Sequence, residues 1–133
     1  MPPYREHESI RILVVGEEPL VCASLVALVS SWDGFQVLGE AAPEEAVKHI
    51  RAFEPDVVLL SLAGADDIDS ELTSGLSSAC DRSQLVVLVG KCHDEFRLHL
   101  LRYGVSSVIT NTEHPMELRK ALEVAYGRKR KQD

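Results

Sequence analysis

The sequence has 133 residues, 45% of them hydrophobic and 26% charged, which is usual for a single soluble globular domain. Its net charge is −7, and four of its fourteen basic residues lie in the last six positions, so the remainder is more acidic still. This acidity argues against direct nucleic-acid binding and against anionic membranes, since attraction to phosphate supplies most non-specific binding. No apolar run approaches the roughly 20 residues that span a bilayer, and the polar amino terminus is unlike a secretory signal.

The three cysteines are Cys22, Cys80 and Cys92. An odd count at wide, unrelated spacings favours reduced thiols over a disulfide framework or a metal site. We therefore expect a cytoplasmic protein without a bound metal or cofactor.

Short β-rich segments alternate with helical stretches along the whole chain. In chain order we expect a strand over 10–15, a helix over 19–31, a strand over 35–41, a helix from 43, a strand over 56–62, a helix over about 69–79, a strand over 84–89, a helix over about 94–103, a strand over 107–109 and a helix from about 115. The first, third and fourth strands are almost wholly apolar, which is typical of parallel strands covered on both faces. The second strand alternates, as an edge strand does.

Residues that are typical of helix starts and ends support these helices. Pro19 and Pro43 suit a first helical turn, where the missing N–H has no partner to lose. Gly104 is a plausible end of the fourth helix. Gly75 and several serines predict a short or irregular third helix. Residues 1–9 are interpreted as an extension, 10–127 as one domain, and 128–133 as a basic tail that is a frayed helix end or the start of a linker.

Five strands that alternate with five helices predict βαβ units and an α/β fold with a doubly wound parallel sheet. Ligands of such sheets bind at the carboxyl ends of the strands, where the strand order reverses. The residues to inspect there follow the first, third and fourth strands: Gly16, Glu17, Glu18, Ser61, Gly90 and Lys91.

Six segments in a fixed order carry a family resemblance: ILVVGEEPLV, VLGEAAPEEAV, PDVVLLSL, LVVLVG, RYGVSSVI and PMELRKALE. Over about 10–126 the chain resembles bacterial response-regulator receiver domains, especially the NarL/FixJ class. The resemblance implies a flavodoxin-like fold with strand order 2-1-3-4-5. It also implies a pocket in which acidic residues bind Mg²⁺, an aspartate ending the third strand accepts a phosphoryl group, and a hydroxyl and a lysine hold the phosphoryl oxygens.

This sequence departs from the family pattern at nearly every position of that pocket. Gly16 and Glu17 stand at the acidic pair, Ser61 at the acceptor, Gly90 at the hydroxyl, Asn111 at the lysine and Val108 at the aromatic that reports the switch. A neutral serine hydroxyl is a poor nucleophile without an adjacent base. We therefore predict a degenerate pseudo-receiver that is not phosphorylated and is not an enzyme.

Lys91 leaves two readings open. Its ammonium either pairs with Glu17 or Glu18, as a built-in counter-charge, or is an exposed lysine with no fixed partner.

The first helix, 19–31, contains no charged residue. If Val21, Leu25 and Leu28 face the sheet, the outward residues are Ala23, Val26, Ala27 and Ser30. An outward helix face usually carries lysine or glutamate, and small apolar residues let a second helix approach closely. This pattern favours an interface, and the alternatives are an alanine-rich solvent face or cover from the fifth helix.

The leading hypothesis is a phosphorylation-independent receiver that acts as a protein–protein interaction or dimerisation module in signal transduction and transcription regulation. Its partner would be another protein or a second copy, and a DNA-binding output domain would follow if the chain is truncated. The alternative is a sensor of phosphate or of a nucleotide in the vestigial pocket. Against it, the GEEPL segment after the first strand offers one glycine and two repelling carboxylates in place of a glycine-rich phosphate loop.

Overall fold

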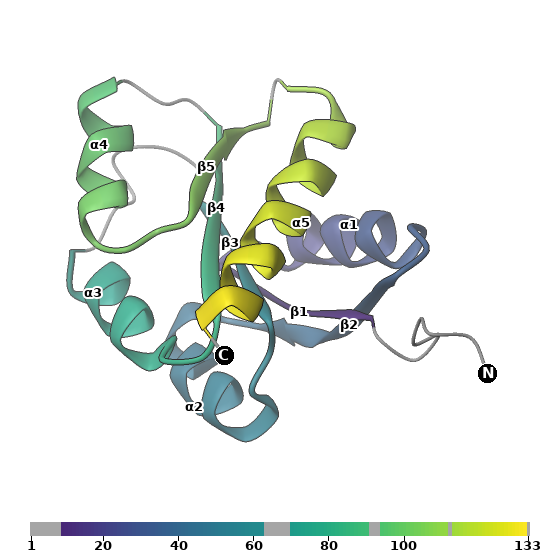
Figure 1. Ribbon diagram of the computed structural model, residues 1–133, viewed down its shortest axis with the longest axis horizontal. Helices are drawn as coiled ribbons and strands as arrows, with labels where there is room; N and C mark the ends of the chain where they lie inside the picture. The colour runs from purple at the N-terminus through teal and green to yellow at the C-terminus, as the bar shows by residue number, and fades with distance from the viewer. Residues whose placement is uncertain (1–8, 63–69, 91–93, 112, 133) are drawn as a thin grey trace.

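The computed structural model describes residues 9–62, 70–90, 94–111 and 113–132. Its strands form one parallel sheet in the order β2-β1-β3-β4-β5 (Figure 1). The strands are β1 (Ile10–Gly16), β2 (Phe35–Ala41), β3 (Val57–Leu62), β4 (Gln84–Val89) and β5 (Ser107–Thr110), and the helices are α1 (Pro19–Ser30), α2 (Pro43–Phe53), α3 (Ser70–Ala79), α4 (Asp94–Arg102) and α5 (Pro115–Gln132). The predicted flavodoxin-like order is confirmed, with β2 at one edge.

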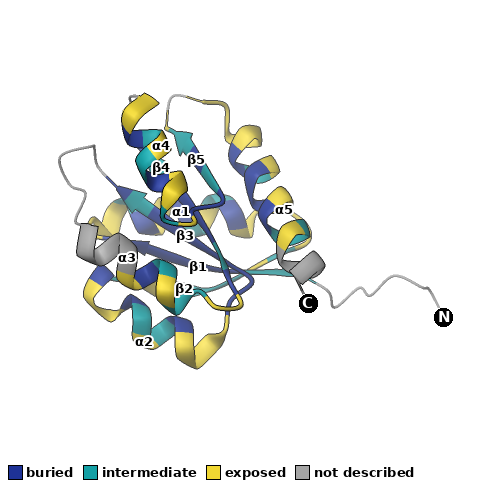
Figure 2. Cartoon of the chain, turned by 60° about the vertical axis from the view of Figure 1, so that its left-hand side comes forward, coloured by how far each residue is buried: buried dark blue, intermediate teal, exposed yellow. Residues whose placement is uncertain are grey.

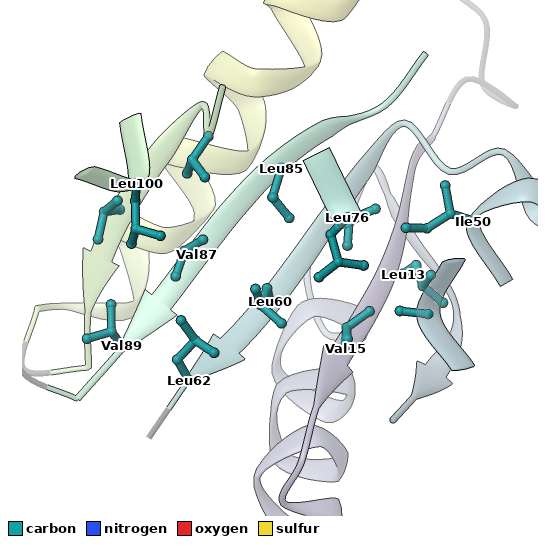
Figure 3. Close-up of a cluster of buried hydrophobic side chains, with 14 of the residues drawn as sticks. Leu13, Val15, Ile50, Leu60, Leu62, Leu76, Leu85, Val87, Val89 and Leu100 are labelled. Carbon is teal, nitrogen blue, oxygen red and sulfur yellow. The ribbon is translucent and has the colours of Figure 1, made fainter. Parts of the chain in front are cut away.

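The sheet has a buried layer on each face, because alternate residues of a strand point to opposite sides. Leu13 and Val15 of β1 lie in the cluster covered by α2, α3 and α4, which Figure 3 shows in close-up. Ile12 and Val14 of the same strand lie in the cluster covered by α1 and α5. The helices are buried along the side that faces the sheet and exposed outside (Figure 2). Burial on both faces explains the continuous apolar runs of β1, β3 and β4.

The helix ends follow the predicted signals. Pro19 and Pro43 occupy first turns, and Gly104 has a φ of 89° just after α4. Although α3 contains Gly75, it is a helix of 10 residues, so the glycine does not interrupt it. The predicted boundary at 127/128 falls inside α5, which continues to Gln132. Arg128 explains this extension, because its guanidinium donates to the Ser106 carbonyl at 2.9 Å and ties the last turns to the body.

Buried polar groups gather at the amino-terminal edge of the sheet. The Arg11 backbone N–H donates to the carboxylate of Asp56 at 2.9 Å. The Arg11 guanidinium donates to the carbonyls of Phe53 and Glu54 at 2.7 and 2.9 Å, which satisfies acceptors at the end of α2. The Ser83 hydroxyl donates to the Pro55 carbonyl at 2.5 Å. These bonds join α2, β1 and the loops before β3 and β4.

Within the described residues, no helix combines the length and the apolar character needed to cross a membrane.

Candidate functional site at the carboxyl edge of the sheet

Gly16 and Ser61 lie side by side where β1 and β3 end. The parallel register pairs them directly, and it pairs Ser61 on its other side with Leu88 of β4. Ser61 is half-buried. The point between β1 and β3 is where the strand order reverses, which is the ligand-binding edge of a doubly wound sheet. The sequence therefore predicted correctly that these two residues share one edge.

Gly16 has no room for a side chain. A Cβ atom at this position would lie 2.8 Å from the sulfur of Cys22 and 3.3 Å from the Cβ of Ser61. Cys22 sits in the second turn of α1 and is 2% exposed. Burial, followed by the charges of Glu40 and Glu18, raises the pKa of the Cys22 thiol. A neutral thiol therefore occupies the space next to the carboxyl end of β1.

Sequence reasoning did not single out Cys22 or Glu40 for this site. A hollow of about 240 Å³ opens between the ends of β1 and β2, beside the Gly16–Ser61 pair. Its lining consists of Gly16, Glu17, Pro19, Cys22, Glu40, Ala41 and Ala42. No lysine or arginine is among these residues. Gly16 ends β1 and Cys22 lies in α1, so no periodic pattern of the sequence linked the two positions.

Gly90 and Asn111 complete the edge on the β4 and β5 side. Gly90 follows β4 and is half-buried, and Asn111 follows β5 with an exposed side chain. The Asn111 backbone N–H donates to the Val89 carbonyl at 2.9 Å, which fixes the chain as it leaves the sheet. Val108 is 3% exposed, and its carbonyl accepts from the Arg97 guanidinium at 2.8 Å. This bond fastens α4 to β5 at the position where the resemblance expects an aromatic side chain.

Glu17 and Glu18 are exposed at the turn between β1 and α1. Lys91 lies outside the described residues, so its predicted pairing with Glu17 or Glu18 stays a prediction. Among the residues that the structure describes, no group of three or more His, Cys, Asp or Glu side chains is placed to hold a metal ion. With a glycine and a serine at two of the three expected ligand positions, these residues do not fit the magnesium site that the fold family implies.

The outward face of α1 differs in part from the prediction. Ala23, Ala27 and Ser30 are exposed as predicted, but Val26 is half-buried. The residues that α1 buries are Cys22, Leu25 and Val29, whereas the predicted Val21 and Leu28 lie at the margin of the core. The helix is therefore rotated slightly from the predicted phase. Leu20, at its start, is 81% exposed.

Curated relatives of the chain are response regulators. It is 29% identical over 122 residues to the response regulator GacA of Pseudomonas viridiflava, a match that covers 91% of this chain and 57% of the relative. It is also 27% identical over 117 residues to the transcriptional regulatory protein CitB of Klebsiella pneumoniae, covering 87% of this chain and 50% of the relative. The chain therefore spans about half the length of these relatives. No protein-family model matches it.

Solved structures of receiver domains share the fold. A two-component response regulator of the LuxR family from Aurantimonas sp. SI85-9A1 superimposes with a TM-score of 0.79 at 25% identity, covering 90% of this chain and 86% of that structure. Sequence relatives and fold relatives thus agree on one class of domain.

Proposed function

We propose that this chain, a receiver domain of the response-regulator type, regulates through a permanently available protein-binding surface and is not phosphorylated. Its place would be in the cytoplasm, in two-component signalling or transcription regulation, with another protein or a second copy as its partner. The observation that carries the proposal is Ser61 at the end of β3, paired with Gly16 across the strand order reversal. At these two positions a receiver needs carboxylates, whereas this chain has the half-buried hydroxyl of Ser61 and, at Gly16, no side chain.

The pocket chemistry supports the absence of phosphoryl transfer. An acceptor must be ionised or activated by a base, and the neutral hydroxyl of Ser61 is a poor nucleophile without one. Hard divalent cations need several oxygen ligands to offset their dehydration, and Gly16 supplies none. Asn111 carries no charge to neutralise phosphoryl oxygens. Metal site, nucleophile and counter-charge are therefore compromised together.

The face of α1 supports the binding role. The helix Pro19–Ser30 has no charge, and its outward residues include Ala23, Ala27 and Leu20. On a chain of net charge −7, this is a surface on which a second copy or an acidic partner can pack without facing like charges. Small outward side chains allow the close approach of another helix.

Phosphate or nucleotide sensing is the less favoured function. The hollow beside Gly16 is lined by Glu17 and Glu40, and no cation among its lining residues offsets their repulsion of a phosphate.

Acetyl phosphate with Mg²⁺ tests the first half of the proposal. We expect intact-mass spectrometry to find no phosphoryl adduct on the chain, because a neutral serine hydroxyl is a poor nucleophile without an adjacent base. A receiver domain with its acceptor aspartate intact, treated in parallel, serves as the positive control. A Mg²⁺-dependent adduct on this chain would refute phosphorylation independence.

Charge on α1 tests the second half. Ala27→Glu should abolish self-association or partner capture, because burying an unpaired carboxylate in an interface costs several kcal/mol, on the order of 3. The fold should survive, since Ala27 is exposed. The matched control is Ala52→Glu, the same change on the exposed side of α2. Light scattering or pull-down paired with circular dichroism gives the answer. If Ala27→Glu behaves like the wild type while Leu98→Glu on α4 disrupts binding, the assignment of the interface to α1 is wrong.

A further inference from the structure

A second hollow, of about 180 Å³, opens between α1 and α5 above the ends of β4 and β5. Its walls are the apolar side chains of Leu25, Leu28, Leu88, Ile109 and Leu118. It lies at the β4 and β5 side of the carboxyl edge, where Leu88 is the strand partner of Ser61, and none of its lining residues lines the hollow beside Gly16. The two hollows are separate features of the molecule.

The hollow exists because two helices share this face of the sheet without closing over it. Helix α1 packs on β1 and β2, whereas α5 packs on β3, β4 and β5. As a result Leu88 and Ile109 are only half-buried on this face, whereas Val87, Val89 and Val108, which point to the opposite face, are no more than 3% exposed. The side chains of Leu88 and Ile109 are thus left partly uncovered, and a small apolar molecule bound against them would cover the rest of their surface.

The polar groups stand at the rim and carry little charge. Asn111 and His114 are exposed there, and Glu113 is the one acid among the lining residues. The Glu113 carboxylate accepts from the backbone N–H of Thr110 at 2.7 Å, so it is engaged by the chain itself. Among the described residues that line the hollow there is no lysine or arginine. An anionic ligand would therefore lose its hydration without gaining a counter-charge.

His114 adds a directional donor to that rim. Its Nδ1 accepts from the Met116 backbone N–H at 3.1 Å at the start of α5. A neutral imidazole that accepts through Nδ1 carries its proton on Nε2, so His114 can donate to a ligand from that atom. The amide of Asn111 can donate or accept. The rim therefore suits a ligand with one polar edge.

Size decides the class of ligand. Drug-sized ligands occupy pockets of about 300–1,000 Å³, which exceeds this hollow. A dry cavity of about 150 Å³ lined by leucine, isoleucine and phenylalanine binds benzene. The volume of about 180 Å³ therefore matches one aromatic ring or a small fused pair.

We propose that the hollow between α1 and α5 binds a small uncharged aromatic molecule, with its ring against Leu28, Leu88 and Ile109 and its polar edge at the rim. This inference does not require that the outward face of α1 binds a partner or that the chain escapes phosphorylation.

Indole is a suitable probe, and methyl-detected NMR of the whole chain is the measurement. We expect saturable shifts of the Leu28, Leu88 and Ile109 methyl groups, with a dissociation constant of about 1 mM or below. Leu28→Trp should weaken binding at least tenfold by filling the hollow. Leu98→Trp, the same change on the exposed face of α4, should leave it unaltered. Leu28→Phe is a milder filling variant, to be used if circular dichroism shows that the tryptophan variant is misfolded.

Three results would overturn the proposal. One is the absence of saturable shifts up to roughly 10 mM indole, beyond which affinity has no specificity. Another is binding that Leu28→Trp and Leu28→Phe leave unchanged. The last is binding that emerges only when the protein is diluted to a monomer, since the hollow would then hold a side chain of a second copy.

Discussion

At the amino-terminal edge of the sheet, Asp56 is 6% exposed and accepts the Arg11 N–H, while Ser83 donates to the Pro55 carbonyl. At the carboxyl edge, Gly16 has no side chain and Asn111 is exposed. Among the described residues, the edge on which doubly wound folds place their chemistry is thus the one poorer in buried polar groups. The edge without a functional role in such folds holds the one buried carboxylate among the described residues. The buried charge has a structural role here, because the hydrogen bonds of Asp56 and Arg11 join β1, α2 and β3.

The largest expected effect follows from removing that carboxylate. Asp56→Ala leaves the partly buried Arg11 N–H without the Asp56 carboxylate and should lower the free energy of unfolding by about 2–4 kcal/mol. Asp81→Ala, a change at an exposed aspartate before β4, should alter it by less than about 0.5 kcal/mol. Urea denaturation of both variants makes the comparison. Equal losses in the two variants would show that the hydrogen bonds of Asp56 contribute no more to the free energy of unfolding than an exposed aspartate does.

The carboxyl edge should resist change for a different reason, which is packing. Gly16→Ala places a Cβ 2.8 Å from the Cys22 sulfur and should destabilise the chain by about 1–3 kcal/mol. Adding Cys22→Ala removes the clashing atom, so the double variant should lose less than the sum of the single losses, with a coupling energy of about 0.5–2 kcal/mol. Gly127→Ala is the control, because nothing lies within 4 Å of its new Cβ. Strictly additive losses would disprove the contact.

The same contact bears on restoring the missing acids. The variant with Ser61→Asp and Gly16→Asp should bind Mg²⁺ more tightly than the wild type only if the Cys22 side chain moves away from the side chain introduced at position 16. We therefore expect calorimetry to give tighter Mg²⁺ binding for the triple variant that also carries Cys22→Ala than for the double variant. A double variant that binds as tightly would show that the thiol rotates away freely.

Most of the fold could be predicted because each strand carries its own evidence. The apolar runs of β1, β3 and β4 follow from burial on both faces, and the alternation of β2 follows from its place at the edge. The position of Gly16 beside Ser61 follows from parallel pairing alone. The short helix predicted around Gly75 is present as the ten residues of α3, because an exposed glycine costs a helix only a small propensity term that contacts such as those of buried Leu76 outweigh.

The site was harder to predict, because packing decides what periodicity leaves open. Helix α1 is apolar on every side, so no polar face marked its rotation, and the phase was misjudged at Val26. The approach of Cys22 to Gly16 depends on how the β1–α1 turn folds back. The hollow between α1 and α5 depends on the spacing of two helices that are distant in sequence, which no local pattern encodes.

The smallest expected effect concerns the thiols on the two sides of the molecule. Burial, with a contribution from the charge of Asp81, raises the pKa of Cys80 from 9.0 to about 12, and burial also raises that of Cys22. In a Cys92→Ser background, both thiols should react with iodoacetamide at pH 8 at least tenfold more slowly in the native chain than in urea, since the thiolate is the nucleophile. A raised pKa also fixes the direction of the linkage. The stability contribution of Cys80 is complete below pH 9.0, where the thiol is neutral in both states, and is lost as the pH rises toward about 12, because the unfolded chain ionises first. Relative to Cys80→Ala, the wild type should therefore lose stability between these values. Native labelling of Cys80 as fast as in urea would contradict its burial. Native labelling of Cys22 alone would show that Cys22 is the more accessible of the two thiols.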